Sequence, residues 1–348
     1  MAREGEGMTR TTPPRPLDIT GVFPELAGLA RTAFRLHPVP GEPTVHDSSV
    51  GGPLLWPADE PWPEYEMAPI PHWEANALRD IHLRRALLAR SSAPPHGPGE
   101  VLTEDEQETL RRINTGLDHE SLPSGPQPMI PLAQLYARDV PGLAFPEGTD
   151  LLQVLWATTY VPSRDSSPVQ LRWRRCAEVR DVLAAPPEPA YVAVVDFVPV
   201  PCVLHPEAVR EFPPYHSLDE DLAARLLAWD EQRSGGTYWT DLSVAPGWKA
   251  GGWPTHFTFR EPPEPDDDEL RCPECGGPSD ALLTVDSNEW DGSDSWIPLE
   301  CAKGAERPPD QPYGNLWDPT QVSIGRGYSL QIYYCVGTPS HSPALIMQ

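Results

Sequence analysis

The sequence has few basic residues compared with its acidic residues. The 348 residues include 26 Lys and Arg against 51 Asp and Glu, a formal net charge of −25 with neutral histidines. Such a field repels the phosphate backbones of nucleic acids, whose binding depends on Lys and Arg that neutralise them. We therefore expect no nucleic-acid ligand. The charge suits a basic protein partner, since complementary charge speeds encounter, although it also serves solubility alone.

Long apolar segments are missing too. No stretch approaches the ~18 apolar residues that a membrane-spanning helix needs. The N-terminal segment, MAREGEGMTRTTPPRP, is polar and lacks the apolar core of a secretory signal. These features predict a cytoplasmic protein with no membrane partner, with residues 1–16 as a disordered tail. In that reducing compartment the six cysteines should be mostly free thiols.

Familiar catalytic motifs are also absent. The sequence has no Gly-x-Ser-x-Gly elbow and no His-Glu-x-x-His pair. Neither Cys176 nor Cys202 lies in a local pattern typical of a nucleophile. We therefore favour a protein without catalytic activity, so no catalytic residue is assigned.

Proline is abundant instead, at 46 of 348 residues, against an ordinary share of roughly 5%. Each proline fixes φ and removes a backbone donor, which limits long helices and central strands. The 12 tryptophans argue against a disordered chain. The composition predicts short helices and strands divided by many ordered turns.

Apolar spacing predicts two helices before residue 100. Residues 25–36 place Leu26, Leu29 and Ala33 on one face, and residues 73–90 do the same with Leu78 and Ile81. In the second segment we expect the arginines to be solvated, namely Arg84, Arg85 and Arg90.

Two capping-box patterns predict further helix starts. Thr103 with Glu106 predicts a polar helix to about Thr115, and Ser217 with Glu220 predicts another one. The helices near residues 73–115 form a predicted insertion between core strands.

Several β-branched and aromatic runs, bounded by Pro, Gly and Ser, predict antiparallel strands. They are Ile130–Tyr136, Asp150–Trp156, Val169–Trp173, Tyr191–Phe197 and Ile332–Cys335. An internal repeat accompanies them, because KAGGWP at 249–254 is similar to VGGP at 50–53 with one residue inserted.

The sharpest local motif is Arg-Cys-Pro-Glu-Cys-Gly-Gly at 271–277. Cys272 and Cys275 form a knuckle whose turn directs both sulfurs inward, as in structural zinc sites with four soft ligands. Cys335 is the best third ligand, and His341 or, alternatively, Cys301 is the fourth. The competing interpretation is a knuckle that has lost its metal and keeps only the turn. A redox dithiol is disfavoured, because no thioredoxin-like pattern surrounds the motif.

Tryptophan–proline pairs offer a candidate surface for a protein partner. Trp56, Trp62 and Trp253 each precede a proline and could line a peptide groove. Tryptophans in such places are otherwise core or half-buried residues.

Four stretches of the sequence resemble the YwqG-like family, a bacterial domain of unknown function. They are SSVGGPLLWPADEPWP (48–63), MIPLAQLYARDVPGLAFPEGTDLLQVLW (129–156), KAGGWPTHF (249–257) and LLTVDSNEW (282–290). The C-terminal part also resembles the programmed-cell-death-protein-2 family, whose members are regarded as chaperones for newly made ribosomal proteins. The first half lacks the cysteine pairs of that second pattern.

The resemblance implies an α+β fold, mainly antiparallel β, in two pseudo-repeated halves with inserted helices. We expect the first half at residues 17–210, a connecting helix and loop at 211–246, and the second half with its knuckle at 247–348. The predicted function is a non-catalytic protein-binding module, immunity-like or chaperone-like. The alternative is a small-ligand-binding or enzymatic domain with its site between the halves.

Overall fold

A computed structural model describes most of the chain. The described residues are 10–66, 75–92, 101–117, 122, 125–159, 168–233, 236–263, 268–290, 293–301 and 316–348. None of the helices in these ranges is long and apolar enough to cross a membrane.

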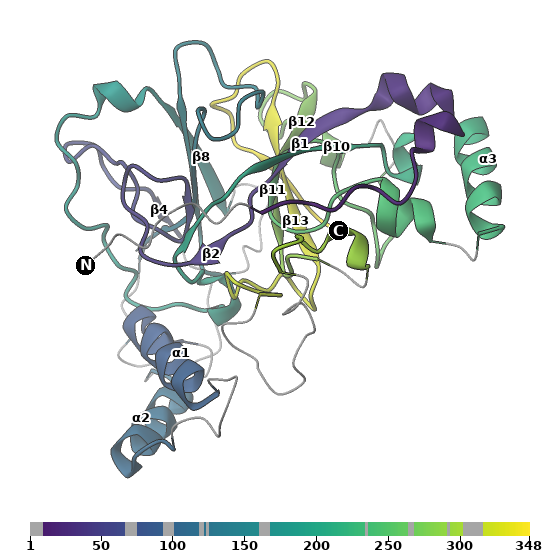
Figure 1. Cartoon of the computed structure of the whole chain (residues 1–348). Helices are drawn as coiled ribbons and strands as arrows, with labels where there is room; N and C mark the ends of the chain where they lie inside the picture. The colour runs from purple at the N-terminus through teal and green to yellow at the C-terminus, as the bar shows by residue number, and fades with distance from the viewer. Residues whose placement is uncertain are drawn as a thin grey trace.

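Two six-stranded antiparallel sheets form the body of the protein (Figure 1). The first sheet has the order β2 (Val39–Pro40), β9 (Cys202–Val203), β3 (Ser49–Val50), β6 (Ile130–Tyr136), β7 (Leu151–Trp156) and β8 (Val169–Arg174). The second has the order β10 (Glu207–Glu211), β1 (Arg31–Arg35), β11 (Lys249–Gly251), β12 (Ser279–Asp286), β13 (Ser329–Cys335) and β14 (Ala344–Met347). A two-stranded sheet pairs β4 (Glu64–Tyr65) with β5 (Gln127–Pro128). The predicted α+β, mainly antiparallel class is confirmed.

The two sheets share the same strand plan. In each, a strand that ends near a Gly-Gly pair is followed by a three-stranded meander, β6–β7–β8 in the first and β12–β13–β14 in the second. The register shifts at the same place, between Pro131 and Ala133 in one sheet and between Ala281 and Leu283 in the other. Gly51 and Gly251 also match, with φ of 62° and 66°. Both turns need left-handed backbone, which glycine adopts without a steric penalty.

The N-terminal part of the chain contributes strands to both sheets, β1 to the second and β2 and β3 to the first. β1 and all but the last residue of β10 lie within residues 17–210; they pair with each other, and β1 also pairs with β11 of the second sheet. The predicted helix over residues 25–36 is therefore wrong: a 3-10 helix covers Pro24–Leu29, and residues 31–35 form β1. Hydrogen bonds to two neighbouring strands satisfy the backbone here and override the local helical spacing.

Three α-helices are described: α1 (Leu78–Ser92), α2 (Glu104–Thr115) and α3 (Glu220–Glu231). α1 and α2 lie together on one side of the sheets, and α3 lies at the opposite end (Figure 1). Thr103 and Glu106 form the predicted capping box. Ser217 does not cap α3, because the carboxylate of Asp219 accepts from the Leu222 amide instead. Residues 73–74 of the predicted helix lie outside the described residues.

Short helical turns connect these elements. The 3-10 turns are Ile19–Gly21, Pro24–Leu29, Cys176–Glu178, Val195–Phe197, Tyr215–Ser217, Asp268–Leu270 and Asp294–Trp296, and Tyr238–Leu242 is a π-helical turn. The predicted strand over residues 191–197 is thus wrong: an isolated bridge at Val192 and the turn Val195–Phe197 take its place. In the described structure the segment makes one bridge to Asn76 rather than a ladder.

The N-terminal segment is held against the body from residue 10 onward, which corrects the prediction of a disordered tail to residue 16. Thr12 donates from its backbone and its hydroxyl to the carboxylate of Glu207. The Arg15 guanidinium lies 3.5 Å from the centre of the Trp296 ring. Tertiary contacts thus hold residues 10–16 in place, although their polar, proline-rich composition is typical of a disordered tail. Residues 1–9 lie outside the described part.

One hydrophobic core joins both sheets. The cluster includes Leu132 and Leu152 from the first sheet and Leu283 and Ile332 from the second, all fully buried. At about 25 cal/mol per Å² of apolar area, this shared interior is the main favourable term that holds the halves together.

A buried ion pair lies where β10, β11 and the second Gly-Gly turn meet. Lys249 Nζ lies 2.7 Å from Glu211 Oε1, and both side chains are completely buried. The Glu211 carboxylate also accepts from the amides of Ala245 and Trp253, at 2.8 Å each. Burial lowers the pKa of Lys249, against which the adjacent Glu211 charge acts to raise it. The lysine and glutamate therefore form one satisfied polar unit inside the core.

Gly252 lies against this unit and provides a test of it. A Cβ atom there would fall 2.3 Å from Glu211 Oε2 and 2.5 Å from the Ala33 Cβ, and φ is +74°. Gly252→Ala should therefore lower the free energy of unfolding by about 2–4 kcal/mol, from overpacking and backbone strain. Urea denaturation measures this change.

Gly28→Ala is the matched control, because no atom lies within 4 Å of a Cβ at Gly28 and its φ is not left-handed. We expect a change within about 0.5 kcal/mol there. Equal stability of the two variants would contradict the proposed packing around Glu211.

Candidate metal centre

The Cys-x-x-Cys motif folds into the predicted knuckle directly before β12. The Gly276 amide donates to the Cys272 carbonyl and the Cys272 amide donates to the Gly277 carbonyl, each at 2.9 Å. Gly276 has φ of 65°, a left-handed conformation that glycine adopts at no steric cost. This tight turn returns the chain on itself and places both cysteine sulfurs on one side.

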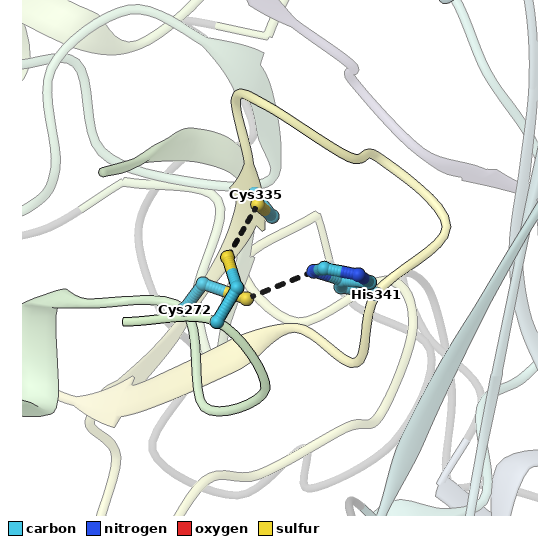
Figure 2. Close-up of side chains that lie close together, drawn as sticks. Cys272, Cys335 and His341 are labelled. Atoms are coloured by element: carbon cyan, nitrogen blue, oxygen red, sulfur yellow. Dashed lines mark hydrogen bonds between the residues drawn. The ribbon is translucent and has the colours of Figure 1, made fainter. Parts of the chain in front are cut away.

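The remaining two residues come from the far end of the same hairpin. Cys335 is the last residue of β13 and pairs with Ser279, the first residue of β12. His341 follows in the turn between β13 and β14, where its amide donates to the Thr338 carbonyl. Strand pairing therefore carries Cys335 to the knuckle, and Figure 2 shows Cys272, Cys335 and His341 directed toward one another.

The four side chains lie close enough together to surround one metal ion. One ligand atom from each of Cys272, Cys275, Cys335 and His341 lies within 4.8 Å of all the others. The sulfurs of Cys275 and Cys335 are 3.7 Å apart, and Cys272 Sγ is 3.4 Å from His341 Nδ1. Zinc–sulfur bonds of about 2.3 Å imply a tetrahedral edge of about 3.8 Å. A disulfide would need about 2.05 Å, and all six cysteines are free.

An acidic side chain stands behind the histidine. Glu274 Oε2 lies 3.9 Å from His341 Nε2, while Nδ1 faces the sulfurs. The Ser342 amide fixes this carboxylate through a 2.6 Å hydrogen bond to Oε1. A carboxylate at the outer nitrogen of a ligating histidine orients the ring and increases its basicity. At 3.9 Å the two atoms are beyond hydrogen-bond distance, so Glu274 acts on His341 through its charge.

The thiols already differ in acidity. Burial acts to raise the pKa of Cys335, but hydrogen bonds from the Thr338 amide and from the thiols of Cys275 and Cys272 bring that pKa below its ordinary value. The Gly277 backbone acts to lower the pKa of Cys275, yet hydrogen bonding with Cys272 and Cys335 raises it. The contacts around Cys335 thus favour its thiolate form, the form in which a cysteine binds a metal.

The burial of the four candidate ligands is typical of a metal site that is closed to substrates. Cys272 and Cys335 are buried, His341 is half-buried and Cys275 is exposed. Four protein ligands complete a tetrahedron and leave no position for a substrate, the arrangement of structural rather than catalytic metal sites. The cluster can hold a metal ion.

Cys301, the alternative fourth ligand, lies elsewhere. It is buried in a separate hydrophobic cluster with Ala245, Trp290 and Trp296. Its packing there excludes it from the knuckle, so His341 occupies the fourth position.

The three candidate tryptophans do not form one surface. Trp56 is completely buried and packs on Trp62 at a ring-centre distance of 4.9 Å, so it has no area to offer a partner. Trp62 is partly buried, and its indole N–H donates to the Met129 carbonyl. Trp253 lies in the other half under the Arg31 guanidinium. Core packing, which the Trp-Pro pattern cannot reveal, decides the role of Trp56.

Sequence reasoning also missed the role of Arg85, which is buried rather than solvated. The guanidinium donates to the carbonyls of Val198, Val195 and Gln321. A signal was available, because Arg85 follows the buried Ile81 by four residues and therefore shares its helix face.

No protein-family model matches this chain, and the comparison with curated proteins finds no match. The resemblance to the YwqG-like and programmed-cell-death-protein-2 families therefore stays a prediction.

Glu274→Gln tests the support given to His341. The neutral amide keeps the shape but removes the charge next to Nε2, so we expect zinc affinity to fall by about tenfold, in the range for such supporting residues. Competition with a chelator measures the affinity. Glu261→Gln, at an exposed acidic position outside the cluster, is the matched control and should leave the affinity unchanged. Equal affinities for all three proteins would contradict this role.

Proposed function

We propose that this chain binds one structural zinc ion through Cys272, Cys275, Cys335 and His341. The observation that supports the proposal is that three sulfurs and one nitrogen lie within 4.8 Å of one another, with the sulfurs of Cys275 and Cys335 3.7 Å apart, close to the tetrahedral edge of a zinc site. Three thiolates and an imidazole are the soft ligand set that zinc takes in such sites.

The metal would fix a loop that joins the two halves. Between Cys335 and His341, the Pro339 carbonyl accepts a 2.9 Å hydrogen bond from the Trp173 indole of β8, in the first sheet. Trp173 also packs edge-on against Phe145, at a ring-centre distance of 5.4 Å. A zinc ion would therefore tie the knuckle, the end of β13 and this bridging loop into one rigid corner.

Metal analysis tests the zinc proposal. The untreated protein should contain about one zinc per chain, and Cys272→Ser should lose it. Since the folded state alone presents all four ligands, loss of zinc should also lower the free energy of unfolding, by about 2–4 kcal/mol.

Cys301→Ser is the matched control, because that thiol is buried away from the cluster. It should keep the full zinc content. The proposal is contradicted if the wild-type protein contains no zinc and takes up none when zinc is added. The knuckle would then be a turn without a metal.

We also propose that the protein is a non-catalytic protein-binding module, immunity-like or chaperone-like, for a basic partner. The net charge of −25 supports this, since charge complementarity accelerates association and discriminates against acidic partners. A closed four-ligand centre also gives the metal no catalytic position. Trp253, half-buried beneath Arg31, and Trp62 are the candidate contact residues that keep some exposed surface.

Affinity purification from native lysate at low and high salt tests this second proposal. We expect a stoichiometric basic protein at low salt, whose complex with purified components weakens as salt rises, because exposed charges are screened. Recovery of no stoichiometric protein, with a small metabolite bound instead, would count against it.

A further inference from the structure

A cavity of about 510 Å³ lies far from the knuckle in sequence and is lined by residues of both halves. The first half contributes residues of α1 and the turn at Val195 and Asp196, and the second contributes residues between Ser287 and Gly327. Small-molecule sites have volumes of roughly 300–1,000 Å³ and often form between domains. The cavity thus has the size and position of a ligand site.

Arginines gather in this cavity although the protein as a whole is strongly acidic. Arg84 from α1 and Arg326 from the β13 side both line it, together with Arg85. Within the described part of the chain, neither Arg84 nor Arg326 has a hydrogen-bond or ion-pair partner. The described lining has three arginines against two aspartates, Asp196 and Asp318, a net of one positive charge. Guanidinium groups bind carboxylate and phosphate oxygens in a bidentate fork.

Arg85 positions the cavity wall. Its buried guanidinium donates to the Val195 and Val198 carbonyls of the first half and to the Gln321 carbonyl of the second. Gln321 has φ of 53°, a left-handed conformation that costs a non-glycine residue roughly 1–2 kcal/mol. Such strain persists where surrounding contacts enforce it, often at functional sites.

Neutral polar groups in the same wall add specificity. The Gln321 Oε1 atom is buried and accepts no hydrogen bond among the described residues. The Asn288 Oδ1 atom accepts from the Trp317 indole. The amide nitrogen of Asn288 remains as a hydrogen-bond donor among the residues that line the cavity. Donors and acceptors together fit a ligand that carries hydroxyl or amino groups beside its negative charge.

We propose that this cavity binds a small organic anion through Arg84 and Arg326, with a phosphate or carboxylate as the recognised group. The cavity and the knuckle share no residue. Anion binding can therefore fail without contradicting the zinc proposal.

Calorimetric titration of the full chain, at constant ionic strength, tests the inference with two probes, inorganic pyrophosphate and citrate. We expect saturable binding of at least one probe with one site per chain, and the preferred probe distinguishes phosphate from carboxylate. Arg84→Gln and Arg326→Gln should each weaken binding by about tenfold or more, since a hydrogen bond to a charged group is lost. Arg84→Lys should recover only part of the affinity, because lysine lacks the fork.

Arg79→Gln is the matched control. Arg79 is an exposed residue of the same helix that does not line the cavity, and its replacement removes the same charge. It should change the affinity by less than about twofold. The inference is overturned if neither probe binds saturably, or if Arg79→Gln weakens binding as much as Arg84→Gln. Unchanged thermal unfolding of each variant shows that the fold is intact.

Discussion

The ion pair between Lys249 and Glu211 is the constraint around which the second sheet is organised. Two charges completely removed from water are tolerated only when every polar atom has a partner. Glu211 achieves this by accepting from the lysine and from two backbone amides, and the lysine also donates to the Trp253 carbonyl. These bonds fix β10, β11 and the Gly-Gly turn relative to one another. β1 is held between those two strands, which ties the N-terminal segment to the C-terminal half.

In the first sheet the equivalent buried polar positions are filled by uncharged side chains, Ser49, Gln134 and Gln153. Ser49 occupies the register position that Lys249 has in the second sheet, opposite Gln134 of β6. Gln134 and Gln153 are buried, share a 2.9 Å hydrogen bond, and bind the backbone of Leu55 and Val45, while Gln153 Oε1 also accepts from the Arg174 guanidinium at the rim. A common strand plan therefore carries two different polar interiors. Amides cost less to bury than charges, so the second sheet depends more strongly on complete pairing.

The proposed functions occupy different parts of this frame. The knuckle lies at the end of the β12–β13 hairpin, and its bridging loop reaches Trp173 of the first sheet. The arginine-lined cavity lies where α1 meets the second half, with Arg85 bonded to both halves. The cavity therefore depends on the relative position of the two halves, which the shared core maintains, whereas all four candidate ligands of the knuckle come from the second half.

The sequence by itself determined features that depend on neighbouring residues: the strands β6, β7, β8 and β13, the Thr103 capping box and the turn at Cys272 and Cys275. Cys335 was the expected third ligand, but the choice of His341 over Cys301 as the fourth came from the tertiary structure. Only the tertiary structure decided that residues 31–35 form a strand, that Arg85 and Trp56 are buried, and that the arginines meet in one cavity. Local spacing reflects preferences within about one helical turn or strand. Strand partners and burial depend instead on segments far apart in the chain, whose backbone groups must all be satisfied together.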